Sequence, residues 1–199
     1  MKIRLDKAQK HLDWLKELLF LDFHNKSARK RVVRRGEVYE CHLGKGIGNE
    51  LEKNRPCVII QNDIANKKAG TTIIAPITNT PGPKKICVEI IGDYPYHRNK
   101  PKKLQGYINL SHMKSVSKAR LGDQITNLKE EINELDEKIL SSLGLYKKYK
   151  RTIDKDKKYI KKVNDKNYMM KQIIKRELGL DEDKKIDIEE IYEKITVEK

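Results

Sequence analysis

The sequence has few cysteines, few aromatic residues and no long apolar run. Three of its 199 residues are cysteine, and none belongs to a Cys-x-x-Cys pair of the kind that binds zinc or forms redox sites. No window is apolar enough to span a membrane, and no apolar run near the start leads to a small-residue cleavage site. We therefore expect a cytoplasmic protein with no cofactor, in which Cys41, Cys57 and Cys87 are buried, reduced thiols.

Several further kinds of site are missing. The glycines of Gly44-x-Gly46-x-Gly48 have neither the spacing of a dinucleotide-binding turn nor the Gly-Lys-Ser/Thr of a P-loop. No pair of catalytic carboxylates and no nucleophile elbow is recognisable. The five histidines show no metal-binding spacing: His11, His24, His42, His97 and His112. Of these, His97 and His112 could reach a substrate phosphate, although a surface or packing role is the simpler interpretation.

The chain is rich in positive charge, which is unevenly distributed. It has 44 Lys and Arg against 29 Asp and Glu, a formal net charge of +15. Residues 37–140 are close to neutral, whereas residues 1–36 carry a net +7 and residues 147–176 a net +10. Residues 177–199 reverse the sign, with a net −5. Such an excess favours a nucleic-acid partner, because neutralised phosphates release counterions; a solvated lysine-rich surface is the alternative.

Apolar spacing predicts a helix, then a strand-rich region. Leucines three and four residues apart predict a helix over residues 5–21, and a basic link follows over residues 24–35. From Gly36 to about Leu121, short apolar runs alternate with turns, as is typical of a small closed β-barrel. The strands are expected at residues 36–43, 55–61, 71–77, 85–91, 106–110 and 112–117.

Helical spacing returns in the last third of the chain. Apolar residues three and four apart predict a helix over residues 118–143, which Gly144 ends. One or two very basic helices are expected over residues 146–178, and Asp187-x-x-Glu190 resembles a capping box that opens a last short helix. These patterns divide the chain into three parts: an N-terminal extension over residues 1–33, a barrel with its closing helix over residues 34–143, and an extension over residues 144–199.

One pair of residues suggests chemistry. Arg55 opens one buried-type strand and Thr78 closes the next. An arginine can bind a phosphate through its planar fork of donors, and a neighbouring hydroxyl can help to move a proton. Taken singly, each residue has a purely structural interpretation, because Arg-Pro often begins a strand and a terminal threonine often satisfies a turn. In a basic chain, however, the pair suggests a phosphodiester substrate.

Several segments in a fixed order resemble the MazF/PemK toxin family over about residues 34–143. They are Gly36–Tyr39, Leu43–Glu50, Arg55–Asp63, Ile73–Thr78, Gly106–Ile108 and Ser115–Leu121. The resemblance implies a mainly β core with added helices (α+β), built on an SH3-like barrel and usually homodimeric. It also implies a metal-independent endoribonuclease that cuts single-stranded RNA at short sequences, in a toxin–antitoxin or phage-defence system, and that a cognate antitoxin silences.

The resemblance also assigns site residues. Arg55 and Thr78 occupy the catalytic positions of the family, where the arginine would stabilise charge and the threonine would bind phosphate or relay a proton. The residues expected to bind RNA are Asn49, Glu50, Lys53, Gln61, Asn79, Lys84 and Lys85. Many relatives have Gly-Ser-Glu-Gln-Gly-Gly before the Arg-Pro, where this chain has the run from Gly48 to Asn54. That departure affects the expected RNA sequence preference more than catalysis.

Two questions stay open at this point. The alternative function is a non-catalytic module on the same barrel, either an inactive RNA-binding protein or a gyrase poison of the CcdB type. The extensions have three interpretations: the basic stretch 147–176 widens the RNA footprint, the apolar stripes extend a dimer or bind a partner, or the acidic residues 177–199 cover the basic groove as an antitoxin would. The sequence identifies neither the cleavage motif nor the antitoxin.

Overall fold

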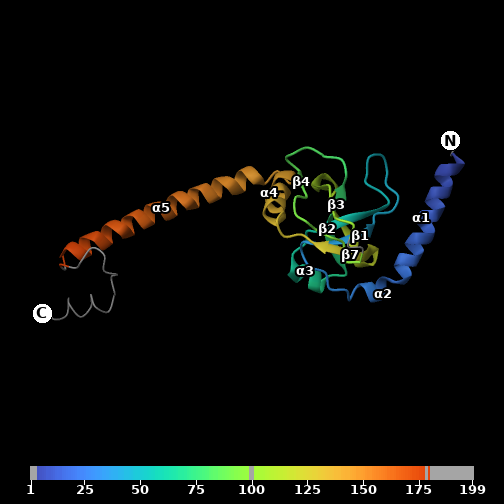
Figure 1. Ribbon diagram of the computed structural model, residues 1–199, viewed down its shortest axis with the longest axis horizontal. Coiled ribbons are helices and arrows are strands. Elements are labelled where there is room, and N and C mark those ends of the chain that lie inside the picture. Colours follow the sequence, from blue (N-terminus) through green and yellow to red (C-terminus); the bar gives the residue numbers. More distant parts are fainter. Residues whose placement is uncertain (1–3, 99–100, 178, 180–199) are drawn as a thin grey trace. The chain divides into compact units, whose positions relative to one another are not determined.

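The structure is a computed structural model that describes residues 4–98, 101–177 and 179. It divides into two compact units, residues 1–146 and residues 147–199. The first unit contains the whole β-sheet and the helices that flank it in the chain (Figure 1). No helix among the described residues is long and apolar enough to cross a membrane.

Seven strands form one antiparallel sheet (Figure 1). Their order is β4-β5-β3-β2-β1-β7, and β6 pairs with the first half of β3. The strands are β1 (Glu37–His42), β2 (Asn54–Ile59), β3 (Thr71–Thr78), β4 (Cys87–Glu89), β5 (Tyr107–Asn109), β6 (Lys114–Ser117) and β7 (Leu121–Asn127). Strand β3 thus pairs with three neighbours along its length, which lets the sheet curl. The predicted fold class, a mainly β core of the SH3-like barrel type with added helices, is confirmed.

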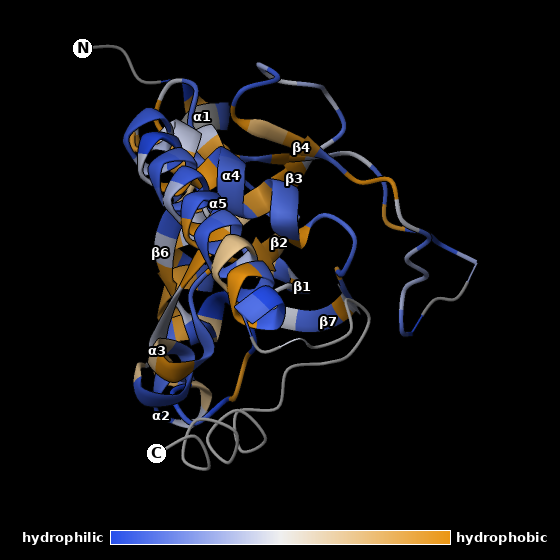
Figure 2. Ribbon diagram, turned by 90° about the vertical axis from the view of Figure 1, so that its left-hand side faces the viewer, coloured by the Kyte–Doolittle hydropathy of each residue, from blue (hydrophilic) through white to orange (hydrophobic). Residues whose placement is uncertain are grey.

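The core lies on both faces of this sheet, because alternate strand residues point to opposite sides. Val38 on β1 and its partner Val58 on β2 contribute to one apolar cluster. Tyr39 and its partner Cys57 contribute to the other. In Figure 2, the hydrophobic colour accordingly gathers in the strands. The expectation of buried thiols holds, since all three cysteines are buried and free of disulfides.

The described residues contain five α-helices besides the sheet. They are α1 (Leu5–Phe23), α2 (Asn25–Ala28), α3 (Asp63–Lys68), α4 (Ile132–Ser142) and α5 (Tyr146–Glu177). The N-terminal helix is confirmed, and α2 lies within the basic link. Helix α3 was not predicted: Asn62 caps it, with its side-chain oxygen accepting a hydrogen bond from the Ala65 amide at 2.9 Å.

The predicted helix over residues 118–143 is wrong in its first half. Lys118–Arg120 form a short 3-10 turn, and Leu121–Asn127 form β7, which pairs with β1. Leu121 and Ile125 are four residues apart yet enter different core clusters, because the β1–β7 pairing contains register shifts, so their spacing does not mark a helix face. Pairing with β1 decides the outcome, and the helical part begins only at Ile132.

Helix α4 is anchored by a buried carboxylate at its start. Glu131, 2% exposed, accepts hydrogen bonds from the backbone amides of Ile91 and Gly92 and from the Tyr94 hydroxyl, at 2.8–3.0 Å. Burial opposes ionisation, but these hydrogen bonds hold the pKa of Glu131 below its usual value. The chain therefore enters α4 fixed to the segment that follows β4.

The described part of the second unit is essentially α5, a single helix of 32 residues. None of its residues is buried, and Figure 2 colours it mostly hydrophilic with short hydrophobic stretches. Gly144, which has a left-handed φ of +72°, separates it from α4, so this predicted helix end is confirmed. The helix expected after Asp187 lies outside the described residues.

Candidate active site

The pairing of β2 with β3 brings the predicted catalytic residues together. The ladder pairs Cys57 with Pro76 and Ile59 with Ile74. Continued by two residues toward the ends of these strands, the same register places Arg55 opposite Thr78. Residues directly opposite in an antiparallel pair point to the same face, with Cβ atoms about 4.5–5.5 Å apart. The two side chains therefore start from neighbouring points on one face of the sheet.

The guanidinium of Arg55 is held at one end. Its Nε donates to the main-chain oxygen of Glu52 at 3.0 Å, which fixes the direction of the side chain. Within the described part of the chain, the two terminal nitrogens have no hydrogen bond or ion pair. Arg55 is half-buried, so four N–H donors remain available to an anionic ligand.

Thr78 is held in a similar way. Its hydroxyl donates to the main-chain oxygen of Thr80 at 3.0 Å, which leaves the oxygen lone pairs as acceptors. Gly106 lies against the backbone here: its φ is +122°, and a Cβ built on it would be 2.5 Å from the Thr78 carbonyl oxygen. Only glycine allows β5 to approach the end of β3 so closely.

A cavity of about 270 Å³ lies against Pro76, two residues before Thr78 in β3. Pro76 forms part of its wall and lies on the same sheet face as Arg55 and Thr78. Its full lining is Glu50, Leu51, Pro76, Ser111, His112, Met113 and Lys114. Apolar side chains thus share the cavity with a carboxylate, a hydroxyl, an imidazole and an ammonium group. A flat ring with polar edges suits such a lining.

The predicted RNA-binding residues of the β1–β2 loop separate into different places. Glu50 lines the cavity beside Arg55, and its carboxylate accepts a hydrogen bond from the Ile47 amide at 3.1 Å. Lys53, with an unusual left-handed φ of +70°, lines a second cavity against α1. Asn49 is exposed on the loop.

The remaining predicted residues are also spread out. Asn79 directly follows Thr78 and is exposed. Lys84 lines a cavity of about 300 Å³ next to α4, and Lys85 is exposed beside it. Gln61 lies beyond the other end of β2, about 20 Å along the strand from Arg55 at ~3.3 Å per residue.

Gln61 is occupied in packing. The side-chain amide nitrogen of Gln61 donates to the side-chain oxygen of the fully buried Asn66 at 3.1 Å. The main-chain carbonyl of Gln61 accepts a hydrogen bond from the side-chain nitrogen of Asn66 at 2.9 Å. The structure therefore does not bring Gln61 to the other site residues.

Sequence reasoning missed most of the far wall of the cavity beside Arg55. Ser111 and Lys114 were not proposed, and His112 was considered only as a group able to reach a phosphate. His112 ends a short 3-10 turn, Leu110–His112, rather than lying within a strand. The available signal was the cluster of polar residues shortly after β5, at Ser111, His112 and Lys114. Among the described residues, no three His, Cys, Asp or Glu side chains gather as a metal site would require.

Comparisons with known proteins identify the family of the chain. Residues 34–143 match the family described as the PemK-like, MazF-like toxin of type II toxin–antitoxin systems. Endoribonuclease EndoA of Bacillus subtilis (strain 168) is 34% identical over 118 residues, which cover 57% of this chain and 97% of that protein.

Among solved structures, an endoribonuclease from mycobacterial species in complex with its cognate antitoxin is 24% identical, covers 57% of this chain and 96% of that one, and has a TM-score of 0.47. MazF from Deinococcus radiodurans is 20% identical, covers 57% and 98% respectively, and has a TM-score of 0.46. Because the family match extends over more than half of the sequence, this chain belongs to the PemK-like, MazF-like toxin family of type II toxin–antitoxin systems.

Proposed function

We propose that this protein is a toxin that cleaves single-stranded RNA without a metal ion, and that Arg55 and Thr78 form its active centre. The observation that carries the proposal is the β2–β3 register, whose last pair, Cys57 with Pro76, lies two residues from both Arg55 and Thr78, together with the cavity of about 270 Å³ that Pro76 lines. Membership of the toxin family and the 34% identity to an endoribonuclease support it. The alternative, a non-catalytic or gyrase-poisoning module, leaves this paired geometry without a role.

In the proposed reaction, the ribose 2′-oxygen attacks the adjacent phosphorus and the bond to the 5′-oxygen breaks. The 2′-hydroxyl loses a proton and the departing 5′-oxygen gains one, so the products are a 2′,3′-cyclic phosphate and a 5′-hydroxyl. The crowded intermediate carries extra negative charge on its phosphoryl oxygens. DNA lacks the nucleophile and should bind without being cut.

Arg55 stabilises this developing charge. Its Nε is bound to the Glu52 carbonyl, so the terminal nitrogens can bind two phosphoryl oxygens in parallel. A donor placed in this way contributes about 3–4 kcal/mol to the transition state, by analogy with an oxyanion-hole group. Because arginine stays protonated, it is a poor general base. Thr78, whose hydroxyl oxygen retains free lone pairs, accepts a hydrogen bond from the attacking 2′-hydroxyl and orients it.

The cavity beside the pair would hold a nucleobase next to the cleaved bond. Its apolar walls suit the faces of a ring, and the Glu50 carboxylate is placed to read a base edge. Asn49, Lys53, Asn79, Lys84 and Lys85 remain proposed RNA contacts on the loops around this face. Gln61 is left out of the proposed interface because it binds Asn66.

We further propose the setting in which the toxin works. It acts in the cytoplasm, as a homodimer, on cellular RNA, and a cognate antitoxin restrains it. Its barrel over residues 34–143 carries the activity, and the extensions over residues 1–33 and 144–199 modify it.

The decisive experiment incubates the purified protein with a long RNA in EDTA and sequences the new 5′-hydroxyl ends. We expect cleavage at a short recurring motif, and we expect the Arg55→Ala variant to lose cleavage while it keeps most of its RNA affinity. Arg98→Ala is the matched control, because Arg98 is exposed and paired with Asp123. Wild-type protein that leaves the RNA intact, or an Arg55→Ala variant that cuts at the wild-type rate, would overturn the proposal.

A further inference from the structure

We propose that helix α1, which lies outside the family match, positions the catalytic arginine, and that Trp14 is the positioning residue through which it acts. The inference rests on the proposed function and concerns the same site. It is carried by a continuous series of contacts that leads from α1 through the β1–β2 loop to Arg55. The loop comprises residues 43–53, between the two strands that it joins.

The first contact in the series is between Trp14 and Gly44. A Cβ built on Gly44 would be only 2.3 Å from a ring carbon of Trp14, so the indole lies directly on the glycine backbone. Gly44 has a left-handed φ of +86°, which favours glycine for a second reason. The absence of a side chain at the start of the loop is therefore what lets α1 approach it.

Two further contacts hold α1 in this place. The guanidinium of Arg120 lies 5.1 Å from the Trp14 ring centre, and one of its nitrogens donates to the His42 carbonyl at 3.0 Å. The Glu17 carboxylate, one helical turn after Trp14, lies 2.5 Å from Nδ1 of His42. Trp14 and Glu17 thus hold the end of β1 from two positions on one helix face.

The middle contacts run across the base of the loop. The Lys53 amide donates to the Gly44 carbonyl at 2.9 Å, and the Leu43 amide donates to the Lys53 carbonyl at 3.0 Å. The Glu52 carboxylate binds the Lys45 ammonium group and the Gly46 amide. The hydrogen bond from Lys45 and, as a smaller cause, the one from the Gly46 amide lower the pKa of Glu52, which is therefore a carboxylate at neutral pH.

The last contact reaches the catalytic group. Glu52 offers its main-chain oxygen to Nε of Arg55 at 3.0 Å. Any shift of Gly44 moves the hydrogen-bonded Lys53, and with it Glu52, its neighbour in the chain. The direction of the guanidinium therefore depends on the contact between Trp14 and Gly44.

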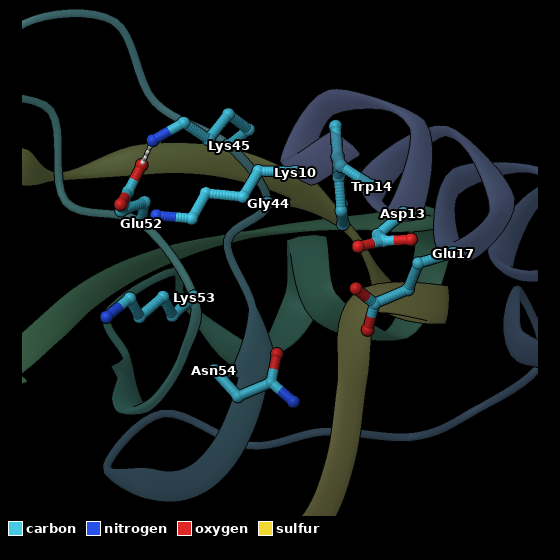
Figure 3. A pocket seen from close by; sticks show the side chains of 9 residues that line it. All are labelled: Lys10, Asp13, Trp14, Glu17, Gly44, Lys45, Glu52, Lys53 and Asn54. Carbon is cyan, nitrogen blue, oxygen red and sulfur yellow. Dashed lines mark hydrogen bonds and ion pairs between the residues drawn. The ribbon is translucent and has the colours of Figure 1, made fainter. Parts of the chain in front are cut away.

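A cavity separates much of α1 from the loop, so few side chains connect the two. The position of the loop therefore depends on those few side chains. The cavity between α1 and the loop has a volume of about 360 Å³. In Figure 3, Trp14 and Glu17 are on the helix side of it, and Gly44 and Glu52 are on the loop side. The complete lining is Lys10, Asp13, Trp14, Glu17, Gly44, Lys45, Glu52, Lys53 and Asn54. Trp14 is the apolar side chain in this lining, so within the cavity the indole supplies the apolar contact between α1 and the loop.

The test compares three variants of the full-length protein. Trp14→Ala removes the contact, and Trp14→Phe keeps an aromatic ring on Gly44. Leu12→Ala is the matched control, because Leu12 lies on the same helix and is 55% exposed. Two quantities are measured for each: kcat and KM for RNA cleavage, and the hydrogen-exchange rate of the Lys53 amide.

We expect Trp14→Ala to lower kcat about tenfold with KM within about twofold, because a misaligned guanidinium loses transition-state contacts more than ground-state binding. We also expect the Lys53 amide to exchange about tenfold faster, since its bond to Gly44 loses support. Trp14→Phe should restore most of both quantities, and Leu12→Ala should match the wild type.

The outcomes separate this inference from the proposed function. Unchanged exchange at Lys53 in Trp14→Ala overturns the inference, and so does faster exchange with unchanged kcat in a protein that cuts RNA. A raised KM with unchanged kcat also overturns it, because α1 would then only bind RNA. If the wild-type protein never cuts RNA, the proposed nuclease fails and this inference fails with it.

Discussion

Replacing Arg55 by lysine separates the charge of the arginine from its shape. Lysine keeps one positive charge on a shorter, flexible stem, but it has a single nitrogen. In the structure, Arg55 uses Nε for the Glu52 carbonyl, and its two terminal nitrogens have no hydrogen-bond partner among the described residues. A lysine ammonium cannot bind that carbonyl and also present two parallel donors to a phosphate. The Arg55→Lys variant should therefore keep its electrostatic attraction to RNA but lose the two parallel hydrogen bonds that align the phosphate.

The expected loss in kcat follows from the role of the two terminal nitrogens of the Arg55 guanidinium. Removal of one well-placed donor to a developing oxyanion costs about 10²–10³-fold in kcat, or about 2.7–4 kcal/mol. Since the ammonium group retains charge near the site, we expect Arg55→Lys at the lower end, about 100-fold. Arg55→Ala, which loses charge and fork together, belongs at the upper end, about 1000-fold. KM should stay within about threefold for both variants, because other basic groups bind the RNA.

The assay uses a short RNA that carries the mapped cleavage motif, with deoxyribose at every position except the cleaved one. Single-turnover rates at saturating protein give the chemical step, and titration against the fully deoxy strand gives binding. If Arg55→Lys cleaves within threefold of the wild-type rate, the fork has no special role and charge alone explains Arg55. If both variants lose binding as much as rate, Arg55 is a binding residue.

Three further perturbations test other parts of the structure. Thr78→Val should lower kcat about 10–100-fold with little change in RNA affinity, because it removes only the hydroxyl; an unchanged rate would exclude Thr78 from the reaction. Glu131→Gln should lower the free energy of unfolding by about 2 kcal/mol at pH 7. The folded-state pKa of Glu131 is lowered, so its contribution is present above the unfolded pKa and is lost as the pH falls through the folded value; the gap between the two unfolding curves should close in acid, and a pH-independent gap would contradict this. If α5 contacts RNA, Lys161→Gln with Lys162→Gln should reduce the slope of log Kd against log salt by about 1.4, whereas an unchanged slope would show that these lysines do not contact RNA.

How far the fold follows from the sequence depends on how distinctive each pattern is. The runs around Val38, Val58 and Ile74 alternate between the two core clusters, and their strands were predicted. The helix spacing around Ile125 was misleading, because Ile125 and Leu128, three residues apart, enter one core cluster without a helix between them, and the pairing of β7 with β1 decided the structure. Helix α3 has only six residues, too short for a helical period to show.

The candidate site shows the same division between local and long-range information. Arg55 and Thr78 could be selected from residue type and strand ends, but their opposition depends on the β2–β3 register, which no local pattern states. Ser111 and Lys114 reach the neighbouring cavity only because β6 pairs with β3. Gln61 shows the converse: it belongs to the same predicted strand run as Arg55, yet it lies past the far end of β2.

The β1–β2 loop connects these findings. The family resemblance implies a glycine-rich run here, whereas in this chain charged side chains hold the loop in place. Glu52 binds Lys45, and Lys53 adopts the left-handed conformation that a glycine would adopt more easily. Such a conformation in a lysine persists only where surrounding contacts impose it, and Trp14 on Gly44 supplies one of them. Because Glu50 and Leu51 of the same loop line the cavity beside Arg55, a loop fixed by α1 would present a fixed base-reading surface. The RNA sequence preference of this toxin should therefore depend on a helix that lies outside the family match.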